Sequence, residues 1–440
     1  MNLIYGIKDK PKFGQMLVFA FQQVLAILAA TIAVPAIVGN GMSASAALFG
    51  AGVGTIVYQL FTKFRSPVFL GSSFAFIGSM VAAFAGAASA SAGFAGLIIG
   101  AVLAGLVYVI IAAVVKAAGV QWINKLMPPV VIGPTVALIG LSLAGAAIKD
   151  VFSYGPQDGN GSFIMSGPAW ASFICAMVTL LVVVLASTYG KKMIKLIPFI
   201  IGILAGYVVA AIFTVCGIPV IDFSVFEGIK LFAVPEFTFV EALKGVKDID
   251  GAFIATIAVA YIPVAFVVFA EHIADHKNLS TIIDSDLLEE PGLHRTLLGD
   301  GVGSMVGAFF GGCPNTTYGE SVGCVAITRN ASVVTITTAA IMCIVISFFG
   351  PFVAFLDSIP GCVMGGVCTT LYGFIAVSGL KMIQKVDLGQ NKNLFVTASI
   401  LIPGIGGMAM AIGPVTLTAI ACSLILGIIV NILLSKAKAE

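Results

Sequence analysis

Charged residues are scarce in this chain. Only 10% of its 440 residues are Asp, Glu, Lys or Arg, whereas about 25% are charged in an ordinary soluble domain. Hydrophobic residues make up 59%, and the mean hydropathy is +1.11. A soluble fold of this composition would leave large apolar patches in contact with water. The composition therefore excludes a soluble globular protein and predicts an all-α protein that crosses a membrane many times.

Signatures of metal, disulfide and nucleic-acid chemistry are also missing. The eight cysteines stand singly, without a Cys-x-x-Cys pair or a His at metal-ligand spacing, so we expect small core residues. His272 and His276 are four residues apart, but the Glu precedes the first His, unlike the zinc helix of metalloproteases. We expect these histidines to be solvated or to cap the cytoplasmic end of a helix. With a net charge of +2, nucleic acid is not an expected partner, and we expect no cofactor.

Charge clusters and Gly, Pro and Asn breaks divide the apolar sequence into about fourteen segments, each close to the ~20 residues that span a bilayer or conspicuously shorter. The first seven predicted spans are 15–38, 44–62, 67–88, 91–115, 120–148, 167–188 and 197–216. The second seven are 251–273, 296–312, 314–328, 332–349, 351–380, 393–411 and 414–434. The segment 217–250, which carries charges of both signs, separates the two sets.

Lysine and arginine mark alternate loops, at 8–12, 63–65, 191–195 and 436–438 among others. Because these residues favour cytoplasmic loops, we expect both termini to be cytoplasmic, in the inner (plasma) membrane. The first apolar run follows a polar, basic start and is long enough to span, so we expect it to remain as a span rather than be cleaved. Seven spans in each half give the halves opposite orientations. This is the inverted repeat of many secondary transporters.

Two carboxylates lie where a bilayer makes them expensive. Glu271 follows nineteen uncharged, mostly apolar residues, and Glu320 is the only charge between Asp300 and Arg329. A charged group at the centre of a span costs about 2.5 kcal/mol or more, so such groups are rare outside pathways and binding sites. Asp275 lies four residues after Glu271 and shares its helix face. The carboxylates predict a polar, proton-accessible site inside the membrane.

Small and turn-forming residues interrupt the third predicted span of each half. Ser72-Ser73-Phe74-Ala75 and Thr316-Thr317-Tyr318-Gly319 share one pattern of hydroxyl, hydroxyl, aromatic and small residue. Extended backbone at membrane depth survives only where it is buried in protein or lines a cavity. Two opposed helix N-termini would offer free N–H groups to carbonyl oxygens or anions, and the two aromatic rings would stack on a flat molecule. This pair of broken spans predicts a binding site between the halves.

Other classes of function fit these features less well. A channel would call for pore-lining rings from several subunits or repeats, whereas two dissimilar half-sites fit one bound small molecule. Paired carboxylates also serve acid–base hydrolysis. However, Gly299-Asp300-Gly301 is only a faint echo of an aspartyl-protease motif, and Asp300 falls at a predicted span end. We expect a transporter rather than an enzyme.

The combination of motifs resembles the nucleobase/ascorbate transporters, also called nucleobase cation symporter 2, and within them the bacterial uracil permeases. The resemblance covers nearly the whole chain. The segments that carry it are Leu70-Gly71-Ser72-Ser73-Phe74-Ala75-Phe76, Ala270-Glu271-His272-Ile273, Asp286-Leu287-Leu288, Pro291-Gly292-Leu293-His294-Arg295, Pro314-Asn315-Thr316-Thr317-Tyr318-Gly319-Glu320, Ala326-Ile327-Thr328-Arg329, Val363-Met364-Gly365-Gly366 and Leu371-Tyr372-Gly373.

The resemblance implies a division of the chain into core and gate domains that move past each other like an elevator, commonly in a homodimer. The core would comprise 1–118 and 251–349, the gate 119–216 and 350–440, and 217–250 would be an extracellular connection. It implies a proton-coupled uracil importer that lies in the lipid bilayer. The proton gradient would drive it, and it would need no cofactor.

The resemblance also implies the roles of individual residues. Glu271 and Glu320 would accept the ring N–H groups of the base, while backbone N–H groups near Phe74 and Gly319 donate to its carbonyls. The implied substrate site further includes Tyr318, Ser73, Ala30 and Tyr372, with Tyr372 closing over the ligand from the gate. Glu271 is expected to carry the coupled proton, with Asp275 as relay or alternative.

Within the resembled family, Gly319-Glu320 matches the way this motif ends in the uracil permeases. The purine and xanthine branches typically have Gln at the position of Glu320. Two departures from the family pattern stand out: Gln22-Gln23 replaces the Gln-His of many relatives, and the position of Asp275 varies among uracil permeases. A xanthine or purine permease on the same scaffold therefore remains an alternative. A more remote one is an anion transporter of the related sulfate/bicarbonate fold, which two cavity carboxylates disfavour.

Overall fold

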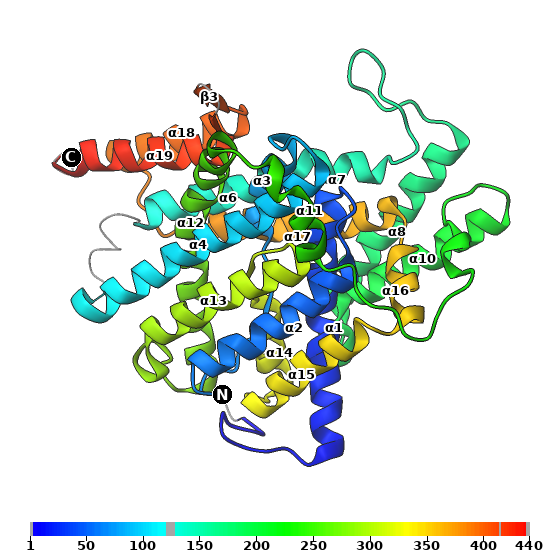
Figure 1. Ribbon diagram of the computed structural model, residues 1–440, viewed down its shortest axis with the longest axis horizontal. Helices are drawn as coiled ribbons and strands as arrows, with labels where there is room; N and C mark the ends of the chain where they lie inside the picture. Colours follow the sequence, from blue (N-terminus) through cyan, green and yellow to red (C-terminus); the bar gives the residue numbers. More distant parts are fainter. Residues whose placement is uncertain (1–2, 120–127, 413–414, 437–440) are drawn as a thin grey trace.

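The computed structural model describes residues 3–119, 128–412 and 415–436, and these are mostly helical (Figure 1). The elements before residue 217 are α1 (Phe13–Val38), α2 (Ala44–Phe61), β1 (Leu70–Ser72), the 3-10 turn η1 (Phe74–Phe76), α3 (Ile77–Ala85), α4 (Ala90–Ala118), α6 (Pro129–Ser142), α7 (Ala144–Val151), α8 (Gly167–Tyr189), α9 (Met193–Leu196) and α10 (Pro198–Val215). The connection that follows contains η2 (Phe223–Phe226), α11 (Thr238–Gly245) and η3 (Val246–Asp248).

The second part of the chain continues in the same helical manner. Its elements are α12 (Gly251–Ile283), η4 (Leu288–Gly292), α13 (Leu293–Gly311), β2 (Asn315–Thr317), α14 (Gly319–Thr328), α15 (Val333–Ile346), α16 (Gly350–Asp357), α17 (Gly361–Ile383), α18 (Asn391–Ile405), β3 (Met410–Ile412), β4 (Val415–Leu417), α19 (Ala419–Leu433) and η5 (Leu434–Lys436). The last two long helices, α18 and α19, pack against each other (Figure 1).

Within the described residues, eight helical stretches are long and apolar enough to cross a membrane: α1, α2, α4, α6 with α7, α8, α10, α12 and α17. The structure departs from the predicted boundaries in several places. The predicted spans 393–411 and 414–434 form the helices α18 and α19 only up to Ile405 and from Ala419, and the paired strands β3 and β4 lie between these helices. The predicted span 351–380 is divided at Pro360 into α16 and α17, and α12 continues past residue 273 to Ile283. The first part of the predicted span 120–148 lies outside the described residues, and the described helices there run from Pro129 to Val151.

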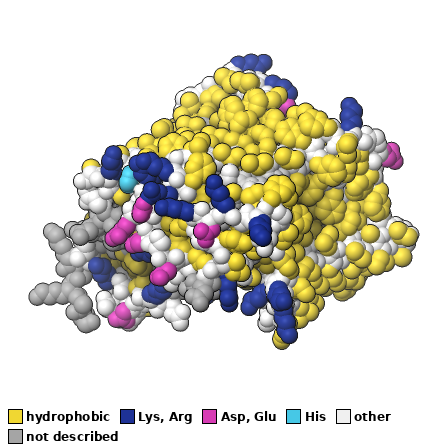
Figure 2. All heavy atoms as spheres, turned by 90° about the horizontal axis from the view of Figure 1, so that it is seen from below, with side chains coloured by type: hydrophobic (Ala, Val, Ile, Leu, Met, Phe, Trp, Pro, Cys, Tyr) yellow, Lys and Arg dark blue, Asp and Glu magenta, His cyan; other side chains and the backbone are white. Residues whose placement is uncertain are grey.

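Hydrophobic side chains also cover much of the outer surface. Figure 2 shows them over most of the right and upper parts of one face, with many of the charged side chains gathered toward the lower left. Large apolar residues such as Ile110, Leu181 and Val208 are more than half exposed. Water would not tolerate so much apolar surface, so lipid is the solvent that this exterior fits. Inside, seven of the eight cysteines are buried, and only Cys216 departs from the expected core location.

Glycines bring α2 and α13 into close contact. A Cβ atom on Gly303 would lie 2.8 Å from the carbonyl oxygen of Gly54, and one on Gly54 would lie 2.8 Å from the carbonyl oxygen of Gly303. Side chains larger than hydrogen would force the two backbones apart. Asn315 uses the space beside these glycines, where its Nδ2 donates a hydrogen bond to the Gly50 carbonyl at 3.1 Å. This crossing of α2 and α13 thus holds Asn315, the first residue of β2, in place.

The two interrupted segments meet as a short antiparallel pair. β1 and β2 align Leu70 with Thr317 and Ser72 with Asn315, so the extended backbone that the sequence predicts is present in both. The hydroxyl of Tyr318 donates a hydrogen bond to the Ser72 carbonyl at 2.7 Å. Each strand leads into a helical segment, η1 and α3 after β1 and α14 after β2. The pair therefore places two helix N-termini in the protein interior.

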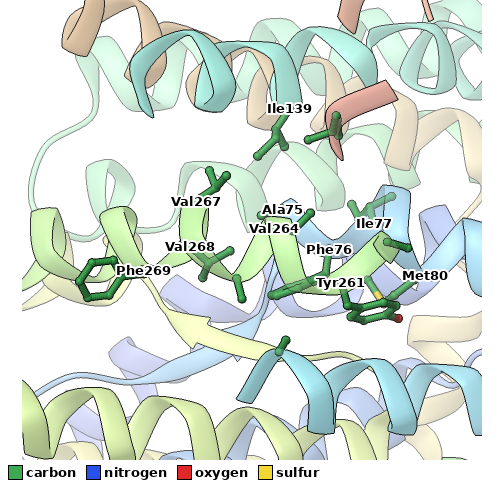
Figure 3. Packing of buried hydrophobic residues seen from close by; sticks show 14 of the residues in the cluster. Ala75, Phe76, Ile77, Met80, Ile139, Tyr261, Val264, Val267, Val268 and Phe269 are labelled. Atoms are coloured by element: carbon green, nitrogen blue, oxygen red, sulfur yellow. The ribbon is translucent and has the colours of Figure 1, made fainter. Parts of the chain in front are cut away.

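The long helix α12 packs beside this pair. The rings of Tyr261 and Phe76 stack with centroids 5.5 Å apart (Figure 3), and the hydroxyl of Ser79 donates to the Ala260 carbonyl at 2.7 Å. These contacts fix α12 against η1 and α3. On the opposite side of α12, Val267 points toward Ile139 of α6 (Figure 3). That side of α12 faces the cavity.

Candidate functional site

A cavity of about 420 Å³ lies between α12 and the two helix N-termini on one side and α6, α10 and α17 on the other. Its volume falls in the range of small-molecule sites. Its lining includes six of the residues that the sequence analysis singled out: Phe74, Glu271, Asp275, Tyr318, Gly319 and Glu320. The structure thus gathers side chains that are far apart in the sequence around one space.

Carboxylates dominate the polar lining of the cavity. Glu271 and Asp275 lie one helical turn apart on α12, and Glu320 lies in the first turn of α14. The hydroxyl of Thr317 donates a hydrogen bond to Oδ2 of Asp275 at 2.7 Å. Among the described residues that line the cavity, none is Lys or Arg. The site therefore offers hydrogen-bond acceptors with negative character and disfavours anions.

Hydrogen-bond donors come from the backbone. The first N–H groups of a helix have no partner within it and carry the positive end of its dipole. α14 begins at Gly319, which is exposed to the cavity, and η1 begins at Phe74 on the other side of the strand pair. Donors and acceptors thus face one space that the Phe74 and Tyr318 rings border.

The remaining three residues implied for the substrate site do not line this cavity. Ser73 is buried, and its hydroxyl has no hydrogen-bond partner in the described structure. Tyr372 is 2% exposed, with its ring centroid 6.2 Å from that of Phe74. Ala30 is buried within α1, in the same hydrophobic cluster as Tyr318 and Tyr372. None of these three side chains forms part of the cavity surface.

Sequence reasoning missed the apolar half of the lining. Val136 and Ile139 of α6, Phe199 of α10, and Leu371 and Phe374 of α17 face the carboxylates across the cavity. Apart from Leu371, which stands in the family segment Leu371-Tyr372-Gly373, no signal in the sequence distinguishes these residues, because the helix sides that face lipid are apolar as well. On this side Ser378 of α17 is the polar residue of the lining, so most of the groups that can orient a ligand lie on the opposite side.

The two histidines of α12 overturn an expectation. His272 and His276 are fully buried within the helix, rather than solvated or capping its end. The ring atoms Nδ1 and Nε2 of His272 lie 2.6 Å from Oδ2 of Asp300 and 3.0 Å from Oγ1 of Thr296. Asp300 is likewise buried inside α13 and not at a span end. Protein partners thus satisfy both ring nitrogens of His272 and Oδ2 of Asp300.

Gln23 is one of the two residues that the sequence analysis noted as a departure from the family pattern. It is buried in α1, and its Nε2 donates a hydrogen bond to Oγ of Ser321 at 2.7 Å. The same Ser321 oxygen accepts from the backbone N–H of Phe69 at 3.2 Å. Ser321 adjoins Glu320, so Gln23 fastens the first turn of α14 to α1.

Comparisons with known proteins agree with the membrane fold. Residues 14–413 match the profile of xanthine and uracil permeases, described as the permease family. The chain is 39% identical over 434 residues to a uracil permease of Bacillus caldolyticus, covering 98% of this chain and 94% of the relative. It is 34% identical over 426 residues to a uracil permease of Escherichia coli (strain K12), covering 96% and 92%.

Solved structures share the fold at low sequence identity. The transmembrane domain of the cyanobacterial bicarbonate transporter BicA matches with a TM-score of 0.64 and 15% identity, covering 97% of this chain and 100% of that chain. The murine anion transporter Slc26a9 matches with a TM-score of 0.68 and 12% identity, covering 97% of this chain and 69% of that chain. At this identity the likeness concerns the fold alone.

The relatives are permeases and not enzymes. The apolar helices cross a membrane several times, and the site is a cavity within them. The chain therefore belongs to the permease family that includes the uracil permeases, the nucleobase/ascorbate transporters.

Proposed function

We propose that this protein is a proton-coupled uracil importer. The observation that carries the proposal is the cavity in which Glu271, Asp275 and Glu320 face two helix N-termini without a lining Lys or Arg in the described structure. Uracil is flat, neutral and bears alternating N–H and C=O groups, so it needs both acceptors and donors. Relatives covering nearly the whole chain are uracil permeases, which favours this base over other small neutral molecules.

Recognition would use the two sides of the strand pair. Glu271 and Glu320 accept the ring N–H groups, and the backbone N–H groups near Gly319 and Phe74 donate to the carbonyls. The hydrogen bond to an ionised Glu320 is charge-assisted and therefore stronger than a neutral one, whereas a protonated Glu271 still accepts through its C=O oxygen. The rings of Phe74 and Tyr318 pack on the base, whereas Ser73, Ala30 and Tyr372 support these groups from behind, with Tyr372 on the gate.

Proton coupling would follow from the cost of moving charge. Bare carboxylates in a site that moves through the membrane are expensive, and taking up a proton together with the base lowers that cost by neutralising one of them. Glu271 is our first choice for the proton carrier, because it follows nineteen uncharged residues of its span and faces the cavity. Asp275, bound by Thr317 and one turn away, serves as relay or alternative.

Alternating access would move the core domain (1–118 and 251–349) past the gate domain (119–216 and 350–440), as an inverted seven-plus-seven repeat in a homodimer. Support comes from the position of the cavity between the elements of these two groups. Its lining extends along α17 to Met382, near Lys381 and Lys385. With both termini and these lysines in the cytoplasm of the cell, the cavity faces inward.

A competition experiment tests the substrate. Purified protein in detergent is titrated with labelled uracil in the presence of unlabelled uracil, thymine, xanthine or adenine. We expect uracil to compete best and the purines not to compete at equal concentration. In proteoliposomes, an imposed inward proton gradient should drive accumulation of unchanged uracil, and a protonophore should abolish it. Preferential displacement by xanthine would refute the uracil assignment, and accumulation that is insensitive to the protonophore would refute coupling.

A further inference from the structure

A second polar group lies behind the cavity, and the proposed transport cycle does not use it. His272 of α12 and Asp300 of α13 are both 0% exposed, and Nδ1 of His272 is 2.6 Å from Oδ2 of Asp300. His272 directly follows Glu271, yet its ring is buried while Glu271 faces the cavity. Of these two successive residues of α12, Glu271 thus lines the cavity and His272 packs in the interior of the protein.

The directions of the hydrogen bonds show how many protons His272 and Asp300 hold together. The hydroxyl of Thr296 donates to the Leu293 carbonyl at 3.0 Å, so its oxygen accepts from Nε2–H of His272 at 3.0 Å. Nδ1 of His272 then faces Oδ2 of Asp300, and two bare lone pairs at 2.6 Å would repel. One proton must lie between the two atoms. A neutral His with a neutral acid and an imidazolium with a carboxylate both satisfy this condition, and both have zero net charge.

The surroundings oppose loss of that proton. In the described part of the chain, no Lys or Arg forms an ion pair with Asp300, and its Oδ1 has no hydrogen-bond partner. The titratable groups that face the pair are the tyrosines of the neighbouring helices, the second histidine and the cavity carboxylates: Tyr58, Tyr108, His276, Glu271 and Asp275. None of these supplies a positive charge in its ordinary buried form. A net negative charge on the pair would therefore be unpaired in the interior.

The pair also connects the two elements that carry the cavity glutamates. α12 bears Glu271, and α13 ends at Gly311, shortly before β2 and the first turn of α14 with Glu320. α13 is itself held to α2 by the glycine crossing. A link from His272 to Asp300 therefore fixes the rotation of α12 relative to the elements that position Glu320.

We infer that His272 and Asp300 are a positioning pair that keeps one shared proton and zero net charge, takes no part in proton exchange, and sets the relative placement of Glu271 and Glu320. This inference deepens the proposed function and rests on it. The binding geometry of the two glutamates depends on the link, whereas the number of protons that enter with the base does not.

The experiment is calorimetric titration of uracil into purified protein in two buffers of different ionisation enthalpy, which yields both Kd and protons taken up per uracil. The variants are Asp300→Leu, His272→Leu and Asp300→Asn, with Glu271→Gln as the reference for a lost carrier. We expect each Leu variant to bind uracil at least about tenfold more weakly, because small displacements of positioned groups are costly. Asp300→Asn, whose amide can donate to Nδ1, should bind more tightly than Asp300→Leu. All three should retain the wild-type proton count, whereas Glu271→Gln should lose it.

Two results would overturn the inference. A folded Asp300→Asn variant that takes up one proton fewer per uracil would make the pair the carrier, and an Asp300→Leu variant with a Kd within about threefold of wild type would remove its positioning role. Size-exclusion profiles establish which variants fold. If neither Leu variant folds, the proton count of Asp300→Asn decides. Failure of the wild type to bind uracil refutes the proposed function instead. The same count is then made with whichever base the wild type binds in the competition assay.

Discussion

Replacing Tyr318 with Phe should loosen the junction between the two broken segments. The substitution keeps the ring and removes only the hydroxyl that donates to the Ser72 carbonyl at 2.7 Å. Tyr318 is 4% exposed and Ser72 is 0% exposed, so water cannot replace the lost donor. Leaving one partner of a buried hydrogen bond unsatisfied costs about 1–3 kcal/mol. Part of this cost should appear in ligand binding, because the bond holds the strand pair between the two helix N-termini.

The matched control is Tyr261→Phe. Tyr261 is also fully buried, and its ring stacks on Phe76, but its hydroxyl has no hydrogen-bond partner in the described structure. Removing that hydroxyl should leave the protein equally stable or more stable. Thermal unfolding in detergent and uracil titration measure both variants. We expect Tyr318→Phe to lower the Tm by at least about 2 °C and to weaken uracil binding, with neither effect in Tyr261→Phe. Equal behaviour of the two variants would refute the reasoning.

Three further substitutions test the site. Glu320→Gln should weaken uracil binding by about 1.5–3 kcal/mol, the value of a charge-assisted hydrogen bond, and relax selectivity among bases in the competition assay; unchanged binding would remove this contact. Glu271→Gln should abolish accumulation driven by a proton gradient in proteoliposomes, and wild-type accumulation would show that another group carries the proton. Gln23→Leu should raise the uracil Kd at least about fivefold through loss of the buried hydrogen bonds to Oγ and the carbonyl oxygen of Ser321. Gln22→Leu should leave the Kd unchanged, because the Gln22 side chain makes no described hydrogen bond. Equal effects of the two variants would contradict the role of Gln23.

Local signals in the sequence predicted the architecture well. Long apolar runs give membrane helices, and Gly, Pro and hydroxyl residues at 70–76 and 313–320 predicted the extended segments that form β1 and β2. These features depend on short stretches of chain. Carboxylates within apolar runs pointed to Glu271, Asp275 and Glu320, which share one cavity. The predictions that no observation tests, such as the homodimer and the cytoplasmic termini, stay predictions.

What the sequence could not supply depends on partners distant in the chain. The burial of His272 follows from Asp300 and Thr296 on another helix, and the role of Gln23 follows from Ser321, 298 residues away. The apolar lining of the cavity could not be predicted from the sequence for a different reason. In a soluble helix the apolar stripe identifies the packed face, but in a membrane the exposed face is apolar as well, so Leu371 and Phe374 look like residues in contact with lipid.

The strand pair has a consequence for the order in which the protein is made. β1 is synthesised early, but the hydroxyl that bonds to Ser72 belongs to a residue 246 positions later. Until that residue emerges from the ribosome, the first strand has no partner for its ladder groups, and such non-local pairing is slow. Every nascent chain that ends before residue 318 therefore lacks Tyr318, Gly319 and Glu320 of the proposed site. A truncated chain inserted in the membrane should be inert, rather than a leaky carrier.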